Sequence, residues 1–364
     1  MTNEMRTMSS PYMNWAKTKS SAKYNLATSG VPNFLMKDFP FEKEDLELTY
    51  GVYGYEPLLE AIANKSEVKS GNVVLSFGTS MANHLAMAAV VETGDEVLIE
   101  TPTYELIVSA AEYLGASVKF FHRRHENKFQ IDVDEIKNKI TDKTKLVVVT
   151  NLHNPSSVYV DDETLKQIGA IASRVGARVL VDEVYLDAMF DDAPRSSFHL
   201  GENFVITNSL TKTYGLSGLR CGWILADTDL VLKMNLLNDL FSASNVHVAE
   251  RLSLIALQNL NLFRNRAKNL LDTNRPLLNS FFDSRDDLEI VKPEYGTTAF
   301  PRLLNVDAEK FFSLLREKYE TSVVPGRFFY AENHFRIGIT CDTEMLKQGL
   351  ERLGAALDEI KREV

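Results

Sequence analysis

A lysine and an arginine lie eight residues apart in the segment Ser209-Leu-Thr-Lys212-Thr-Tyr-Gly-Leu-Ser-Gly-Leu-Arg220. A lysine amine becomes a covalent catalyst when its surroundings lower its pKa, as in enzymes that form Schiff bases with aldehydes. An arginine held nearby by glycine-containing turns offers the planar fork that binds a phosphate through two hydrogen bonds. Together the two residues indicate a site for pyridoxal phosphate, although the segment alone also fits an ordinary surface loop.

Two further groups follow predicted strands and carry matching chemistry. Gly78-Thr79-Ser80 comes between a strand at 73–77 and a predicted helix, where backbone N–H groups and hydroxyls can bind an anion. The same residues also fit a simple helix cap. Asp182 ends the apolar strand 178–182, and its carboxylate suits a protonated pyridine nitrogen, which keeps the cofactor ring an electron sink. Its plain alternative is to cap the next helix.

Four more residues complete the candidate set. Asn154 and Tyr185 suit hydrogen bonds to the phenolic oxygen of the cofactor, and Tyr104 suits stacking on its ring. The alternatives are an Asn-Pro turn for Asn154 and ordinary packing for the tyrosines. Arg336 lies in the apolar run Phe335-Arg-Ile-Gly-Ile, where a buried guanidinium needs an anionic partner. That partner is either a substrate carboxylate or an internal Asp or Glu.

The order of strands and helices predicts how these residues are positioned. Short apolar runs alternate with helical stretches, which is typical of a mostly parallel sheet covered by helices on both faces. Ligands of such sheets bind beyond the carboxyl ends of the strands. The expected strands are 73–77, 96–100, 145–150, 178–182, 204–208 and 222–226.

The pattern changes after about residue 228, where long helical stretches lead into a compact α+β segment. We predict a large cofactor-binding domain at 46–260 and a smaller α+β domain made of 1–45 and 261–364. Residues 1–45 contain Pro11, Gly30, Pro32 and Pro40, and the sequence predicts an irregular arm there.

Composition excludes several classes of function. The 364 residues carry a net charge of −10, which argues against non-specific binding to nucleic acid or to an anionic membrane. Two cysteines are typical of a reducing compartment, and no apolar run has the length of a membrane span. The N-terminus lacks a signal-peptide pattern, so we expect a cytoplasmic protein.

The ordered motifs make the chain resemble the class I/II aminotransferases of the fold-type I superfamily of pyridoxal phosphate enzymes. The resemblance covers nearly the whole chain. It rests on these landmarks: Ser29-Gly30-Val-Pro32, Gly54-x-x-x-Leu58, Gly78-Thr79-Ser80, Asn154-Pro155, Asp182-x-x-Tyr185, Ser209-x-x-Lys212, Gly218-x-Arg220-x-Gly222, Pro325-Gly326 and Arg336-Ile.

The resemblance implies a role for each candidate. Lys212 would form the Schiff base and move the proton at the substrate α-carbon, and Arg336 would bind the substrate carboxylate with help from the backbone at Gly30. Members of the family are usually homodimers in which a tyrosine of the second copy reaches the phosphate; Tyr50 is the first candidate and Tyr53 the second. The implied cofactor contacts come from Gly78, Thr79, Ser80, Tyr104, Asn154, Asp182, Tyr185, Ser209, Lys212 and Arg220.

The implied function is an aminotransferase that moves an amino group between an L-amino acid and a 2-oxo acid. The alternative is a lyase, cyclase or synthase with the same cofactor, such as a β-eliminating enzyme, because those enzymes share the landmarks. One departure is Asn154-Pro-Ser-Ser157, where the family often has a glycine in the last position.

No metal site is expected. His122-Arg-Arg-His125 is interpreted as a solvated strand end.

Overall fold

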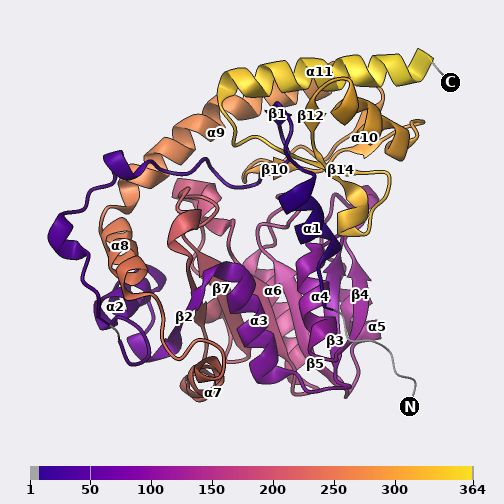
Figure 1. Cartoon of the computed structure of the whole chain (residues 1–364). Coiled ribbons are helices and arrows are strands. Elements are labelled where there is room, and N and C mark those ends of the chain that lie inside the picture. Colours follow the sequence, from indigo (N-terminus) through magenta and orange to yellow (C-terminus); the bar gives the residue numbers. More distant parts are fainter. Residues whose placement is uncertain (1–7, 50, 363–364) are drawn as a thin grey trace.

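The centre of the structure is a sheet of seven strands with helices on both faces (Figure 1). The strands are Val73–Phe77 (β2), Glu96–Thr101 (β3), Ser117–His122 (β4), Thr144–Thr150 (β5), Arg178–Asp182 (β6), Phe204–Ser209 (β7) and Cys221–Leu225 (β8). This computed structural model describes residues 8–49 and 51–362. The strand order is β2-β8-β7-β6-β5-β3-β4, and only β8 runs antiparallel to its neighbours. The predicted mostly parallel sheet is confirmed.

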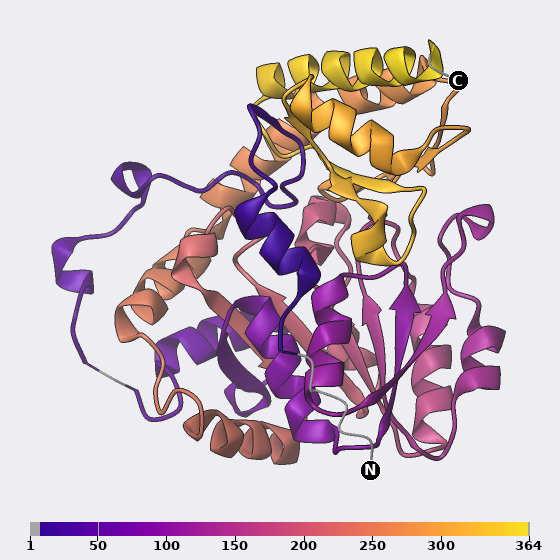
Figure 2. The same ribbon diagram turned by 45° about the vertical axis from the view of Figure 1, so that its right-hand side comes forward.

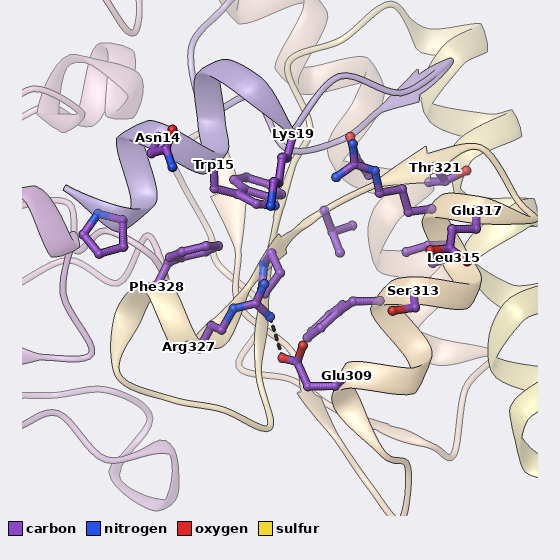
Figure 3. A pocket seen from close by; sticks show the side chains of 16 residues that line it. Asn14, Trp15, Lys19, Glu309, Ser313, Leu315, Glu317, Thr321, Arg327 and Phe328 are labelled. Atoms are coloured by element: carbon purple, nitrogen blue, oxygen red, sulfur yellow. Dashed lines mark hydrogen bonds and ion pairs between the residues drawn. The ribbon is translucent and has the colours of Figure 1, made fainter. Parts of the chain in front are cut away.

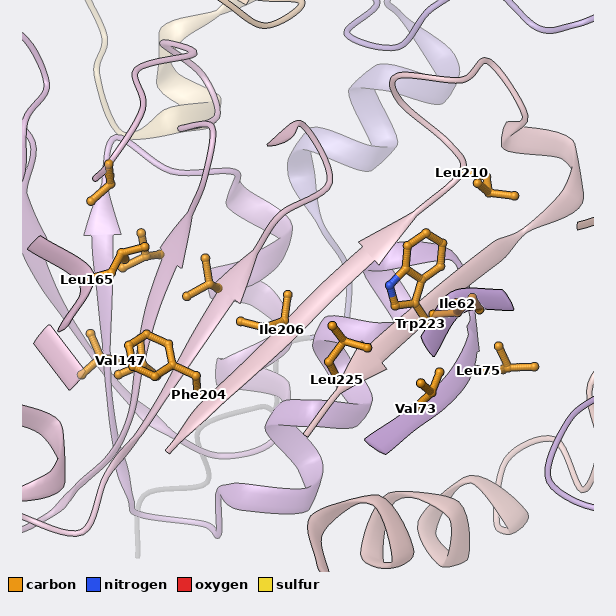
Figure 4. Close-up of a cluster of buried hydrophobic side chains, with 14 of the residues drawn as sticks. Ile62, Val73, Leu75, Val147, Leu165, Phe204, Ile206, Leu210, Trp223 and Leu225 are labelled. Atoms are coloured by element: carbon orange, nitrogen blue, oxygen red, sulfur yellow. The ribbon is translucent and has the colours of Figure 1, made fainter. Parts of the chain in front are cut away.

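Successive residues of β5 enter two different hydrophobic cores, one on each face of the sheet. Val147 and Val149 belong to the core drawn in Figure 4, whereas Leu146 and Val148 belong to the core on the other face. Side chains alternate along a strand, so a strand covered on both sides must be apolar at every position. This is why the strands appear in the sequence as continuous apolar runs.

Helices cover each of the two cores. The core of Figure 4 is covered by Glu56–Ser66 (α2), Val133–Lys139 (α5), Asp162–Ser173 (α6) and His247–Gln258 (α8). The opposite core is covered by Gly78–Val90 (α3), Glu105–Tyr113 (α4) and Thr228–Asp239 (α7). In the described part of the chain, no helix is long and apolar enough to cross a membrane.

The C-terminal part of the chain forms a third core above the carboxyl ends of the large sheet (Figure 2). Its helices are Leu260–Asp283 (α9), Ala308–Glu317 (α10) and Thr343–Arg362 (α11). Its short strands are Leu288–Glu289 (β9), Thr298–Ala299 (β10), Arg302–Leu303 (β11), Thr321–Ser322 (β12), Val324–Pro325 (β13) and Phe335–Gly338 (β14). Leu26 of the arm joins this core, while Phe39 and Phe263 join the core of Figure 4. The division at residues 45 and 260 stays a prediction.

The N-terminal arm is more ordered than the sequence predicts. It contains the helix Pro11–Thr18 (α1) and the short strand Tyr24–Asn25 (β1), which pairs in parallel with β12. Ser10 caps α1 by accepting a hydrogen bond from the backbone N–H of Met13. Helices this short are marginal alone, so packing against the rest of the fold must stabilise α1. The irregular arm was a wrong prediction for this stretch.

Candidate active site

Side chains with catalytic chemistry converge in a cavity of about 210 Å³ at the carboxyl ends of the strands of the large sheet. The carboxyl ends of β2, β3, β5, β6 and β7 each contribute at least one polar group, as expected for an open α/β sheet, and Arg220 comes from the residue before the antiparallel β8. The cavity is lined by these predicted site residues: Thr79, Ser80, Tyr104, Asn154, Asp182, Tyr185, Lys212, Arg220 and Arg336. Gly30 lines an adjoining cavity of about 350 Å³, which shares Lys212 and Arg336 with the first. Tyr50 lies outside the described residues.

One corner of the cavity is built for an anion. Helix α3 begins at Gly78, so the unpaired N–H groups of its first turn and the guanidinium of Arg220, which lies beside Gly78, are brought to the same corner. A Cβ on Gly78 would lie 2.3 Å from Nη2 of Arg220, and a Cβ on Gly222 would lie 2.5 Å from the carbonyl carbon of Gly78. Both positions therefore need glycine for this close approach. Thr79 donates a hydrogen bond of 2.8 Å to Ser209, which places two hydroxyls at the same corner.

Arg220 has no acidic partner among residues 8–49 and 51–362. Its guanidinium donates to the carbonyl oxygens of Phe77, at 3.0 Å, and Ser217, at 3.3 Å. A guanidinium with only neutral acceptors keeps its charge for a ligand, and its fork matches a phosphate. Charge and shape at this corner therefore fit the phosphate of the predicted cofactor.

Asp182 is the buried carboxylate of the site. It accepts hydrogen bonds from the side chain of Asn83 at 2.8 Å and from the backbone of Val184 at 3.0 Å. Burial raises the pKa of Asp182 to about 6, against the opposing effects of these hydrogen bonds and of Lys212. A cationic N–H brought next to Asp182 would restore the charged form, which is what a protonated pyridine nitrogen offers.

Lys212 and Tyr185 meet at a third side chain, the hydroxyl of Ser29. The amine of Lys212 donates to this hydroxyl at 3.1 Å, and the phenol of Tyr185 donates to it at 2.8 Å. In the described part of the chain no carboxylate forms an ion pair with Lys212. The sequence pattern marks Ser29 only as the neighbour of Gly30, and nothing in it indicates contact with the lysine.

Arg336 is almost fully buried, with 1% of its surface exposed. Its guanidinium donates to the side-chain oxygen of Asn154 at 3.0 Å, to the hydroxyl of Tyr12 at 3.1 Å and to the carbonyl of Ala27 at 3.1 Å. Its Nε has no hydrogen-bond partner among the residues described. The same residues include no carboxylate paired with it, so an internal Asp or Glu does not satisfy this arginine. A ligand carboxylate fits the vacant donor.

Helix α1 forms one wall of the cavity through Tyr12 and Met13. The Tyr12 ring lies edge-on to Tyr104, with ring centroids 5.2 Å apart, and the Tyr104 hydroxyl contacts the sulfur of Met13 at 3.1 Å. The backbone N–H of Tyr12 donates to Glu105, which fastens α1 to the start of α4. Ser10-Pro11 is a recognisable helix start, and it is the one local signal for this wall.

A buried ion pair supports the site from behind, and it corrects for Arg123 the interpretation of residues 122–125 as a solvated strand end, which holds for the exposed His122 and Arg124. Arg123 donates to Glu100 at 2.9 Å, and neither side chain is exposed. Glu100 also accepts hydrogen bonds from the backbone and hydroxyl of Thr150, and that hydroxyl accepts from the backbone of Asn154. The charge of Arg123 looks solvated along the chain because its partner lies on the neighbouring strand β3. The described residues include no cluster suited to a metal ion.

The loop after Asn154 closes without the glycine that the family often has. Ser157 adopts a left-handed backbone conformation with φ of 61°. Its hydroxyl donates to the carbonyl of Thr298 at 2.8 Å, which ties the loop to β10. Gly296 makes room for this contact, since a Cβ there would lie 2.5 Å from the Ser157 hydroxyl.

A larger cavity of about 640 Å³ lies between α1 and α10, away from these groups (Figure 3). It is lined by aromatic side chains such as Trp15 and Phe328 and by the ion pair of Arg327 with Glu309. None of the predicted site residues lines it. Convergent chemistry, and not size, therefore identifies the smaller cavity as the candidate site.

Comparison with known proteins agrees with this geometry. The family model described as "Aminotransferase class I and II" matches residues 24–353. The chain belongs to that family. It is 30% identical over 362 residues to a capreomycidine synthase of Streptomyces vinaceus, covering 95% of this chain and 93% of that protein. It is 29% identical over 358 residues to a probable aspartate/prephenate aminotransferase of Aquifex aeolicus, covering 91% and 90%.

The fold has a close solved counterpart. A structure described as a PLP-dependent aminotransferase from Streptococcus suis superposes with a TM-score of 0.89 at 24% identity, covering 96% of each chain. The predicted family, fold class and enzyme class are confirmed, and pyridoxal phosphate is the cofactor of this family. The guanidinium of Arg220 with its neutral acceptors, the unsatisfied Nε of Arg336 and the buried carboxylate of Asp182 fit that cofactor and its substrates.

We predict that cofactor affinity depends on the ionisation of Asp182. Below pH 6 the cofactor-free protein must lose a proton from Asp182 before it can pair with a protonated pyridine, so affinity falls by about tenfold for each pH unit. Titration of the cofactor-free protein with pyridoxal phosphate between pH 5 and 8 measures this effect. Asp182→Asn supplies the background that arises from the titration of the cofactor itself. Equal pH profiles for the two proteins would contradict the assignment.

We also predict that Arg220 recognises phosphate specifically. Arg220→Gln removes charge-assisted hydrogen bonds, so the dissociation constant for pyridoxal phosphate should rise by about 10- to 100-fold. Pyridoxal, which lacks the phosphate, is the matched ligand, and its affinity should change less than about twofold because it makes none of these bonds. Equal losses for both ligands would show that Arg220 acts through the fold instead.

Proposed function

We propose that this protein is a pyridoxal-phosphate-dependent aminotransferase that moves an amino group between an L-amino acid and a 2-oxo acid. One observation carries the proposal: Lys212, Arg220 and Arg336 line the same cavity as the buried carboxylate of Asp182, and none of the three forms an ion pair with a carboxylate among the described residues. The lysine suits an aldehyde and the buried carboxylate suits a pyridinium. The two arginines suit a phosphate and a carboxylate. Membership of the aminotransferase class I and II family supports the same reaction.

Each residue of the site has a proposed role. Gly78, Thr79, Ser80, Ser209 and Arg220 hold the phosphate, since they share the anion corner at the start of α3. Asp182 pairs with the pyridine nitrogen, and Tyr104 lies against the ring. Asn154 and Tyr185 contact the phenolic oxygen of the ring. Arg336 binds the substrate carboxylate, assisted by the backbone at Gly30.

In the proposed reaction the cofactor and the side chains of the site act together on one atom, the α-carbon of the substrate. The bound cofactor supplies the electron sink for the bond broken at the substrate α-carbon. The amine of Lys212 would accept the proton from the α-carbon of the substrate. The same amine would then return the proton to the carbon bonded to the other side of the nitrogen that is transferred. Arg336 fixes the substrate carboxylate, which determines the bond that faces Lys212. Tyr12 and Met13 of α1 exclude water from this side of the cavity.

A synthase or cyclase with the same cofactor is the second candidate. The capreomycidine synthase relative favours it, because that protein matches 95% of this chain at 30% identity. Such reactions also begin with removal of a proton by a lysine, so the roles above would hold for both. The two candidates differ in what happens to the amino group, and only transamination passes it to a 2-oxo acid.

We further infer that the active protein is a homodimer with shared sites. Large apolar side chains are exposed on the arm near residues 46–53 and on and after α7, among them Leu48 at 94%, Val52 at 76% and Leu240 at 78%. Such side chains favour burial against a second copy. Tyr50 of that copy, or Tyr53 in its place, is proposed to reach the phosphate at Arg220.

The cytoplasm is the proposed location, supported by the two free cysteines and the net charge of −10. Fractionation of the source cells tests it, and recovery outside the cytoplasm would contradict it.

The two domains proposed from the sequence are supported by the separate core formed by residues 271–360 with Leu26. Limited proteolysis that cuts near residue 260 would agree with this boundary.

Product analysis with a panel of amino acids tests the proposed reaction. We expect 2-oxo acid to accumulate only when an acceptor 2-oxo acid is present, because the amino group must leave the cofactor before the next turnover. Lys212→Ala should reduce turnover at least about 100-fold, since it removes the general base. Lys137→Ala on the exposed face of α5 is the matched control. Release of ammonia without an acceptor would contradict transamination and favour elimination.

The proposed dimer has a direct measurement. Sedimentation equilibrium of the holoenzyme should give twice the chain mass of 41.0 kDa at assay concentration. A fully active species with the mass of a single chain would contradict shared sites.

A further inference from the structure

Ser29 contacts both of the side chains that the proposed reaction needs at its centre. Its hydroxyl oxygen accepts a hydrogen bond from the amine of Lys212 at 3.1 Å and another from the phenol of Tyr185 at 2.8 Å. Only 5% of Ser29 is exposed. A hydroxyl has two acceptor positions, so both are used here by functional neighbours.

The backbone holds this hydroxyl in a fixed position beside the lysine. The N–H of Val31 donates to the carbonyl of Lys212 at 2.8 Å, so the segment around Ser29 is attached to the lysine by the main chain. A Cβ on Gly30 would lie 3.4 Å from Cδ of Lys212. On its other side the segment packs on β14, where a Cβ on Gly338 would lie 1.8 Å from the carbonyl of Thr28. Ser29 therefore cannot move away from Lys212 without a shift of the segment.

We propose that Ser29 is a positioning residue that holds the amine of Lys212 for proton transfer at the substrate α-carbon. An amine that donates one N–H to a fixed acceptor cannot rotate freely, so its lone pair keeps one direction. With Ser29 as the acceptor, the remaining positions of the nitrogen face the cavity shared with Asp182 and Arg336. The idea deepens the proposed function and rests on it for the identity of the reaction.

The contact between Ser29 and Lys212 is measurable without turnover. An acceptor stabilises the ammonium form relative to the free amine, so Ser29→Ala should make Lys212 react faster with an electrophile at a given pH. The other titratable groups lining the cavity stay in place in this variant: Tyr12, Tyr104, Asp182, Tyr185, Arg220 and Arg336. A change in the Lys212 amine can then be assigned to the hydroxyl.

The first experiment labels the full-length, cofactor-free protein with trace acetic anhydride across pH 6 to 11 and quantifies the peptide that contains Lys212. In Ser29→Ala and Ser29→Gly we expect labelling of Lys212 at pH 8 to rise about 3- to 10-fold, since the net loss of one typical hydrogen bond corresponds to that range. Ser29→Thr keeps a hydroxyl and should stay within about twofold of the original protein. Ser280→Ala, an exposed serine of α9, is the control for a general effect. Circular dichroism checks that each variant is folded.

The second experiment measures the holoenzyme with an amino acid deuterated at the α-carbon. We expect Ser29→Ala to lower kcat about tenfold and to increase the isotope effect on kcat, because a misplaced base slows proton transfer. KM should change less than about twofold, since Arg336 still binds the carboxylate. An increase of KM with unchanged kcat and isotope effect would overturn the proposal and make Ser29 a substrate ligand.

The two experiments fail in different ways. An unchanged labelling profile in both Ser29→Ala and Ser29→Gly would overturn the proposed role of Ser29, whatever the reaction is. A shifted labelling profile together with ammonia release in the absence of an acceptor would leave Ser29 as the positioning residue of a different reaction. In that case the aminotransferase assignment fails and the contact with Lys212 stands.

Discussion

Three cationic side chains converge on one small cavity, and no carboxylate of the described residues pairs with any of them. Lys212, Arg220 and Arg336 line a space in which Asp182 is the one acidic residue. Like charges gathered at a partly buried site repel each other and lose hydration, so this arrangement costs stability in the free protein. A ligand that carries a phosphate and a carboxylate offsets that cost, and its binding stabilises the fold by linkage. In the free protein the site therefore carries positive charges that a bound ligand must balance.

The scaffold tolerates these charges by giving each cation neutral acceptors. Arg336 donates to an amide oxygen, a phenol and a main-chain carbonyl, and Arg220 donates to two main-chain carbonyls. Lys212 donates to the Ser29 hydroxyl. Neutral acceptors satisfy hydrogen bonds without cancelling charge, which leaves the full attraction available to an anion. The buried pair of Arg123 and Glu100 shows the opposite solution, in which the charge is cancelled and the pair serves to hold the loop of Asn154.

The parts of the site that follow strands were accessible from sequence, because local pattern determines them. A continuous apolar run marks a strand that is buried on both faces, and the polar residue after it must lie at the edge of the sheet. Asp182 after β6 and Lys212 after β7 are found in this way. Gly78 and Gly222 have a similar local signal, although the reason for it, contact between two segments of backbone, is visible only in the fold.

Contacts between distant segments were not accessible. Tyr12 reaches Arg336 across 324 residues of sequence, and Ser29 reaches Lys212 across 183. Both depend on the path of the arm, and a helix as short as α1 depends on tertiary packing more than on its own residues. Arg123 was misplaced for the same reason, since a charge next to other charges looks solvated until its partner on another strand is known.

Two of the residues that sequence pattern missed, Ser29 and Tyr12, contact side chains with a proposed role in the reaction. The cofactor and its holding residues allow several outcomes after the α-proton is removed, and the family contains both an aminotransferase and a synthase among the relatives of this chain. What separates the outcomes is where the proton is returned and whether water or a substrate group reaches the cavity first. Ser29 contacts the amine that is proposed to return the proton, and Tyr12 of α1 lines the same cavity. We therefore infer that the contacts of the arm with Lys212 and Arg336, in addition to the residues at the strand ends, bear on which reaction follows.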